Sequence, residues 1–280
     1  MSDYFKINGP TCISFSGGRT SAYMLWRVLQ SNNGLPNSAR VIFCNTGKED
    51  EATLDFVEHC SFYWGVKIIW LEYRLGAQFE IVSFETASRS GEPFDQVIQQ
   101  RVPSLPNGRS RYCSSELKTR TMHRFLRSVG WDEWDSFVGI RADEPRRVAK
   151  FRANNHPEGS HETIVLPLAS LGVGAVDISN FWQSQPFDLG LPNNNGKTMH
   201  GNCDLCYLKP ASQVLSLIKE RPSRATWWIG QEEKAASRCA GDGRYFAIDR
   251  PNYKTMLTFS QNQNDMFDKN EEGIACFCGD

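Results

Sequence analysis

Two groups of residues have types and spacing that could carry chemistry, and the first lies near the N-terminus. The segment Ser14-Phe15-Ser16-Gly17-Gly18-Arg19-Thr20-Ser21 joins a short apolar run to an amphipathic pattern. A glycine pair between a strand and a helix lets the backbone approach phosphate oxygens, and free N–H groups at the helix start attract the anion. Ser16, Thr20 and Ser21 add hydroxyl donors, and Arg19 adds charge. The segment predicts a phosphate-binding loop; an ordinary strand-to-helix turn is the alternative.

The second group consists of cysteines. The chain has nine, an odd number, and its N-terminus does not read as an export signal, which argues against a disulfide framework. Cys203 and Cys206 are separated by two residues, as metal and cluster sites favour, although a chance pair or a redox dithiol gives the same pattern. Cys276 and Cys278 form another close pair near the end of the sequence.

The remaining cysteines differ in their surroundings. Cys113 lies among basic residues, a setting that stabilises a thiolate or a neighbouring phosphate. Cys12 and Cys44 fall in apolar runs and Cys60 in a helical pattern, so we expect all three in the core. Cys239 lies in a glycine-containing loop and is a weaker ligand candidate.

The first half of the chain alternates strand and helix patterns. Apolar runs predict four strands, and 3.6-residue periodicity predicts helices over Thr20–Leu29 and Glu51–Trp64. The strands are Cys12–Phe15, Arg40–Cys44, Val66–Leu71 and Ser136–Ile140. This order predicts an α/β fold with a parallel sheet and helices on both faces.

The second half has a different character. We expect Ser83–Arg111 to be irregular and Leu189–Gly201 to be a loop, because both are rich in Pro, Gly or Asn. Helices are predicted over Ala211–Lys219 and Ser223–Ala236. We therefore expect a nucleotide-binding α/β domain over residues 1–180 and a helical, cysteine-bearing segment over 181–280 packed on it.

Three separate segments converge on one edge of the predicted sheet. Ligands of such sheets sit at the carboxyl ends of the strands, near the point where strand order reverses. Ser16-Gly17-Gly18, Asn45-Thr46-Gly47 and Arg141 all fall there. Arginine suits bidentate phosphate contact, so Arg141 is the leading phosphate ligand, with Arg146 or Arg147 as a second one.

Motifs along residues 11–210 resemble, in order, those of the PP-loop adenine nucleotide alpha-hydrolase superfamily, in particular its PAPS reductase-like branch, with a Rossmannoid fold. They are the SFSGGRTS loop, Phe43–Glu49, Arg111-Tyr112-Cys113 with Glu116-Leu117-Lys118, Gly139–Arg147, Leu166-Pro167-Leu168 with Val176-Asp177-Ile178, and Gly201–Cys206. The chain looks most like the iron–sulfur ATP pyrophosphatases of DNA phosphorothioation systems of the Dnd and Ssp types.

The resemblance implies ATP, Mg²⁺ and a [4Fe-4S] cluster as cofactors. Three cluster ligands would be Cys113, Cys203 and Cys206, and the fourth Cys276 or Cys278, with Cys276 favoured; structural zinc is the alternative. The catalytic residues would be Ser16, Arg19, Lys118 and Arg141. The nucleotide would be bound by Ser14, Ser16, Gly17, Gly18, Arg19, Thr20, Ser21, Asn45, Thr46, Gly47, Gly139, Arg141 and Arg146. ATP-cleaving members usually have Asp in place of Thr20, so Asp143 or Glu144 is the candidate substitute for magnesium.

The leading function that the resemblance implies is cleavage of ATP to AMP and pyrophosphate, which adenylates an acceptor for sulfur insertion. The expected partners are a cysteine desulfurase and DNA or another nucleic acid, and a homodimer is a further expectation. The alternatives are a PAPS or adenylylsulfate reductase that releases sulfite, and a non-catalytic regulator that binds nucleotide and zinc. The intact Gly17-Gly18 pair and the lack of an E-C-G-L-H tail favour ATP.

Composition narrows the partners further. With 31 basic and 32 acidic residues, the chain has almost no net charge that would attract nucleic acid or an anionic membrane. Binding of a nucleic acid would therefore need a local basic patch. No stretch approaches the roughly 18 apolar residues of a membrane span. We therefore expect a cytoplasmic protein without a membrane partner.

Overall fold

The computed structural model describes residues 3–153, 161–194, 197–201 and 203–262. The predicted ligands Cys276 and Cys278 lie outside these residues.

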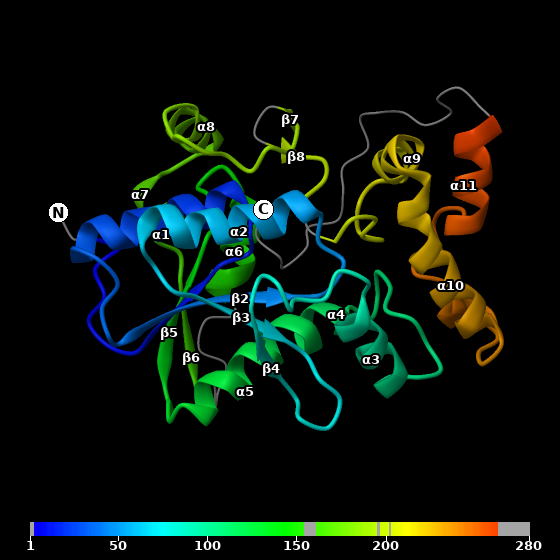
Figure 1. The fold of residues 1–280 in the computed structure, drawn as a ribbon, viewed down its shortest axis with the longest axis horizontal. Coiled ribbons are helices and arrows are strands. Elements are labelled where there is room, and N and C mark those ends of the chain that lie inside the picture. The colour runs from blue at the N-terminus through cyan, green and yellow to red at the C-terminus, as the bar shows by residue number, and fades with distance from the viewer. Residues whose placement is uncertain (1–2, 154–160, 195–196, 202, 263–280) are drawn as a thin grey trace.

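A six-stranded sheet forms the centre of the larger part of the molecule (Figure 1). Its order is β4-β3-β2-β1-β5-β6, and every neighbouring pair is parallel except β3 with the edge strand β4. The strands are β1 Thr11–Ser14, β2 Ala39–Asn45, β3 Ile68–Glu72, β4 Glu80–Val82, β5 Trp134–Val138 and β6 Glu162–Val165. The chain moves outward from β1 to β4 and then returns to β5 beside β1. The reversal of strand order therefore falls between β1 and β5, where a ligand crevice is expected.

Helices cover both faces of this sheet, which confirms the predicted fold class. On one face Ile13, Val41 and Phe43 pack in one core with residues of α1 and α2. On the other, Cys12 and Ile42 pack against α5. The helices are α1 Arg19–Asn32, α2 Glu51–Trp64, α3 Glu92–Gln100, α4 Tyr112–Ser114, a π-helix Ser115–Arg120, α5 Thr121–Ser128, α6 Pro145–Ala153, α7 Pro167–Leu171, α8 Ala175–Gln183, α9 Ala211–Glu220, α10 Ala225–Ala236 and α11 Tyr253–Asn262.

Local signals explain the accurate boundaries of α2. Asp50 caps its start, because the side chain accepts a hydrogen bond from the backbone N–H of Ala52. Gly65 ends it in a left-handed conformation at φ 58°. The predicted range Glu51–Trp64 is therefore confirmed.

The prediction of an irregular segment over Ser83–Arg111 was wrong in its middle. Glu92–Gln100 is α3, whose buried residues are Pro93, Phe94, Val97 and Ile98. Pro93 stands in the first turn, where its missing N–H costs no helical hydrogen bond. Within the predicted loop Leu189–Gly201, two short strands pair antiparallel, β7 Asn193–Asn194 and β8 Lys197–Thr198.

A second hydrophobic core lies beyond the end of the sheet, around α9, α10 and α11 (Figure 1). Trp228 of α10 is fully buried in it. Residues of the first half join this core, among them Tyr73, Phe94 and Leu117. In the other direction, Trp182 and Leu191 pack into the first core. Each core therefore contains residues from both sides of residue 180, and the domain boundary there stays a prediction.

Within the part of the chain that the structure describes, no helix has both the length and the apolar character to cross a membrane.

Candidate functional site

The glycine pair lies at the carboxyl end of β1 and opens α1. Gly17 has φ 80°, and a Cβ added there would lie 2.6 Å from Cγ2 of Thr53. Gly18 is the N-cap residue of α1, no side chain caps the helix, and its first turn contains no acidic residue. The first turn of this 14-residue helix therefore supplies no carboxylate of its own to neutralise the positive end of the helix dipole. This is the geometry that phosphate binding at a helix N-terminus uses.

The hydroxyl groups of the loop divide into two roles. Ser21 is buried and closes the loop: its Oγ accepts from the Ser16 backbone N–H at 3.2 Å and donates to the Gly18 carbonyl at 3.0 Å. Ser16 is half-buried, and its Oγ lies 2.9 Å from Ser21 Oγ. Because the Ser21 proton goes to Gly18, Ser16 is the donor in this contact and would have to turn its hydroxyl group to donate to a ligand, whereas Ser21 holds the shape of the loop.

Arg19 is held by a residue that sequence reasoning missed. Its Nε donates to Asp188 at 2.7 Å and its Nη2 forms a second bond to the same carboxylate at 2.5 Å. Nη2 also donates to the Leu191 carbonyl at 3.0 Å, and the side chain is only 10% exposed. The Arg19 guanidinium lowers the pKa of Asp188 against the opposing effect of burial. In this structure Arg19 therefore joins the phosphate loop to the segment after α8.

The segment after β5 reaches the same loop. A Cβ on Gly139 would lie 3.1 Å from the Ser21 Cα, so glycine permits close packing of the strand end against α1. Arg141 donates from Nη1 to Thr20 Oγ1 at 3.3 Å. Two of the three predicted segments therefore meet at the reversal of strand order.

The carboxylates proposed for magnesium are engaged elsewhere. Asp143 accepts from Arg141 Nε at 2.9 Å and from the Ala175 backbone N–H at 2.9 Å. Glu144 accepts from the Arg141 backbone N–H at 3.0 Å and pairs with Arg147. Arg146 is exposed at the start of α6.

Buried hydrogen bonds and close packing fix the shape of the loop after β2. Asn45 is fully buried; its amide donates to Glu72 at 2.6 Å and accepts from the Gly47 N–H at 3.1 Å. A Cβ on Gly47 would lie 2.9 Å from the backbone nitrogen of Gly91, so this turn excludes other residues. The Thr46 hydroxyl donates to the buried carboxylate of Glu49.

The loop after β2 also contacts the segment that carries Cys203 and Cys206. Glu49 forms an isolated antiparallel bridge with Cys203. Lys48 pairs with Asp204 at 3.1 Å, both side chains are nearly buried, and Trp228 Nε1 donates to the same aspartate at 2.8 Å. The backbone N–H of Asp204 also donates to the Lys48 carbonyl at 2.6 Å. The loop after β2 is therefore joined directly to the segment that carries Cys203 and Cys206.

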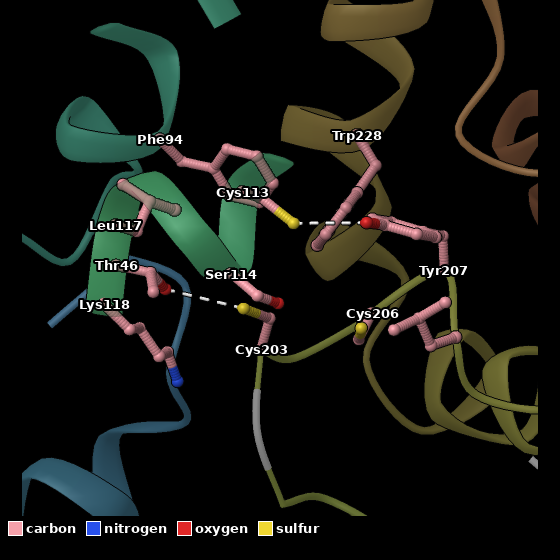
Figure 2. A pocket seen from close by; sticks show the side chains of 11 residues that line it. Thr46, Phe94, Cys113, Ser114, Leu117, Lys118, Cys203, Cys206, Tyr207 and Trp228 are labelled. Carbon is pink, nitrogen blue, oxygen red and sulfur yellow. Dashed lines mark hydrogen bonds between the residues drawn. The ribbon is translucent and has the colours of Figure 1, made fainter. Parts of the chain in front are cut away.

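Three predicted cysteine ligands line one pocket, shown in Figure 2. Cys113 comes from α4, and its Sγ lies 3.1 Å from the Tyr207 hydroxyl. Cys203 Sγ lies 3.5 Å from Thr46 Oγ1, and Cys206 is buried beside them. The lining residues are Thr46, Phe94, Cys113, Ser114, Leu117, Lys118, Cys203, Cys206, Tyr207, Leu208 and Trp228. Among the described residues, no set of three or more His, Cys, Asp or Glu is close enough to hold one metal ion.

Lys118 also lines this pocket, with its Nζ 4.0 Å from the Glu49 carboxylate. The predicted core cysteines Cys12, Cys44 and Cys60 are buried, as expected. Burial raises the pKa of the Cys12 and Cys60 thiols, which keeps both protonated and unreactive. Cys239 lies apart, donating to the Ala240 carbonyl at 3.3 Å.

Fold and loop together have the architecture of nucleotide-binding α/β proteins, with a glycine-rich loop at the strand reversal. The phosphoadenosine phosphosulfate reductase domain family matches residues 10–183, and the chain belongs to this family. Members of this family are enzymes that act on nucleotides.

Two relatives are similar to the chain. The uncharacterized nin region protein ORF290 of Escherichia phage lambda is 28% identical over 216 residues, which cover 72% of this chain and 67% of that protein. The uncharacterized protein MJ0066 of Methanocaldococcus jannaschii is 30% identical over 166 residues. That match covers 59% of this chain and 30% of that longer protein.

Proposed function

We propose that the protein cleaves ATP to AMP and pyrophosphate and thereby adenylates an acceptor for sulfur insertion. The observation that carries the proposal is the Gly17–Gly18 loop, which presents the uncapped N-terminus of α1 at the strand reversal. An acceptor oxygen attacks the α-phosphorus, the bond to the β-phosphate breaks, and pyrophosphate leaves. A persulfide sulfur of the donor protein then attacks the activated acceptor atom, AMP leaves with the acceptor oxygen, and a thiol reduces the resulting disulfide so that one sulfur stays on the acceptor. Backbone N–H groups of the loop and Arg141 would stabilise the charge that develops on the phosphates.

Magnesium would enter this site with the nucleotide. Asp143 and Glu144 are engaged by arginine and by backbone N–H groups, so neither fits as a ready ligand. Mg²⁺ commonly keeps several waters and binds substrate phosphates with one or two carboxylates.

Three thiols line the cysteine pocket, and thiolate is the ligand type that an iron–sulfur cluster or zinc takes, although the described side chains do not stand close enough together to hold one metal ion. Cys113, Cys203 and Cys206 reach the pocket from two separate segments, so they would hold three positions of a [4Fe-4S] cluster. The fourth would come from Cys276 or Cys278, which lie outside the described residues. A cluster there would supply electron transfer or sulfur relay, whereas zinc would be structural. Lys118 and Tyr207 would contact the same pocket from the protein side.

The proposed acceptor is a phosphate oxygen of the DNA backbone, and the proposed sulfur donor is a cysteine desulfurase. Both follow from the resemblance to phosphorothioation enzymes. The contacts of residues 46–49 with Cys203 and Asp204 support a composite site, because they join the segment of these cysteines to the loop that follows β2.

A second candidate is a PAPS or adenylylsulfate reductase, which the matched family's own description favours. One experiment separates the candidates. The protein is purified anaerobically and incubated either with ATP and Mg²⁺ or with PAPS and thioredoxin. Release of pyrophosphate and AMP is expected, whereas sulfite release would replace our proposal with the reductase. Tight ATP binding without turnover in either mixture would indicate a non-catalytic regulator.

A further inference from the structure

The helical segment that carries Cys113 also carries an unusual concentration of positive charge. Residues 101–128 contain seven Arg or Lys and a single acidic residue, Glu116. The rest of the chain has 24 basic and 31 acidic residues, so the positive charge is local to this segment.

Glu116 cannot neutralise the arginines that surround it. Its side chain is 2% exposed, and Arg101 and Arg120 approach the same oxygen at 2.5 and 2.7 Å. Arg124 lies 3.6 Å from the other oxygen, and its Nη1 is buried with no hydrogen-bond partner among the described residues. Three guanidinium groups therefore share one carboxylate, which leaves about two positive charges unbalanced.

These charges are arranged as a stripe. Arg120, Arg124 and Arg127 follow one another at helical spacing, over ~10 Å at ~1.5 Å per residue. The Arg101 side chain stands beside them from the end of α3 and is 44% exposed, while that of Arg120 is 56% exposed. Other residues of the same helical segment, Cys113 and Leu117 among them, line the cysteine pocket.

We propose that Arg101, Arg120, Arg124 and Arg127 form a docking surface for the phosphate backbone of a nucleic acid. A row of arginines pre-oriented by a buried carboxylate suits repeated phosphate groups, and it reads charge rather than base sequence. A nucleic acid on this surface would pass beside the pocket that contains Cys113. The surface supplies the local basic patch that a nearly neutral chain needs, and the bound partner's role as sulfur acceptor rests on the proposed function.

The test measures binding of the full chain to a fluorescein-labelled 20-nucleotide DNA, single-stranded and duplex, over a series of salt concentrations. The variant R120Q/R127Q loses two phosphate contacts. The slope of log affinity against log salt should therefore become shallower by about 1.4 for the single strand and about 1.8 for the duplex. R127Q alone, which leaves the Glu116 cluster intact, should give half of that change.

The matched control is R152Q/R238Q, which removes two exposed arginines from α6 and from the end of α10. Its slope should equal that of the wild type. An equal weakening in both double variants, or no binding by the wild type, would overturn the docking surface. Pyrophosphate release by the wild type is measured in parallel without DNA, where water takes the place of the acceptor oxygen, so failure of the proposed ATP reaction is seen separately.

Discussion

The phosphate loop and the cysteine pocket are built by different means. The loop is made from residues adjacent in sequence, and its shape comes from Gly17, Gly18 and the buried Ser21 hydroxyl. The pocket is assembled from α4, the loop after β2 and the segment of Cys203 and Cys206. A local loop can keep its geometry through changes elsewhere, whereas a site made of distant segments depends on how those segments pack. The two sites should therefore respond differently to substitution.

The largest expected effect is the loss of nucleotide turnover in Gly17→Asp. The new side chain would clash with Thr53 at a left-handed φ and bring a carboxylate to the phosphates, so turnover should fall at least about 100-fold. Gly34→Asp is the control, because Gly34 also has a positive φ but open space around it. Pyrophosphate release measures both. Near-normal turnover in Gly17→Asp would mean that the nucleotide binds elsewhere.

The second prediction concerns the pocket alone. Cys203→Ser and Cys206→Ser should each lose most of the iron of anaerobically purified protein, because each removes one thiolate ligand. Cys60→Ala removes a buried thiol of the first core and should keep the iron. Iron content and the visible absorption spectrum measure the result. Full retention of iron in Cys203→Ser would exclude that ligand, and zinc in place of iron would exclude the cluster.

The third prediction tests whether the two sites share one folding unit. Asp204→Ala leaves Lys48 buried without its counterion, so the free energy of unfolding should fall by about 3–5 kcal/mol. Glu233→Ala breaks an exposed pair with Lys254 and should cost at most about 1 kcal/mol. Denaturant titration followed by fluorescence measures both. A cost below about 1 kcal/mol for Asp204→Ala would show that this contact does not tie the parts together.

The smallest expected effect is a pH dependence confined to the second core. Burial raises the pKa of Glu232 to about 7, against hydrogen bonds from the Tyr253 and Phe246 backbone N–H groups. An acid whose folded pKa exceeds its unfolded value stabilises the fold fully at low pH. From about pH 4.5 to about pH 7, the free energy of unfolding should therefore fall by roughly 2–3 kcal/mol.

Glu232→Gln should flatten this dependence, while Glu233→Gln, at an exposed position, should leave it unchanged. Denaturant titrations across that pH range measure the slope. An unchanged slope in Glu232→Gln would assign the pH dependence to other groups.

Sequence patterns predicted those strands and helices whose formation depends mainly on residues close together in the sequence. Apolar runs located β1, β2 and β3, and a cap and a glycine located α2. They missed α3, because Pro93 suggested irregular structure although it stands in the first helical turn. They also did not reveal that Asp188 pairs with Arg19, or that Glu116 pairs with several clustered arginines. A contact between residues 169 positions apart, such as that of Arg19 with Asp188, leaves no local pattern to find.

The π-helix over Ser115–Arg120 has a geometric consequence. Such a turn holds one residue more than an α-helical turn. It lies between Cys113, on the pocket side, and Arg124 and Arg127, and Arg120 is its last residue. Deleting one residue here would restore a regular helix and rotate the two groups relative to each other by about 100°, one residue's share of a turn. The extra residue therefore sets the angle between the side of this helical segment that lines the pocket and the side that carries the arginines.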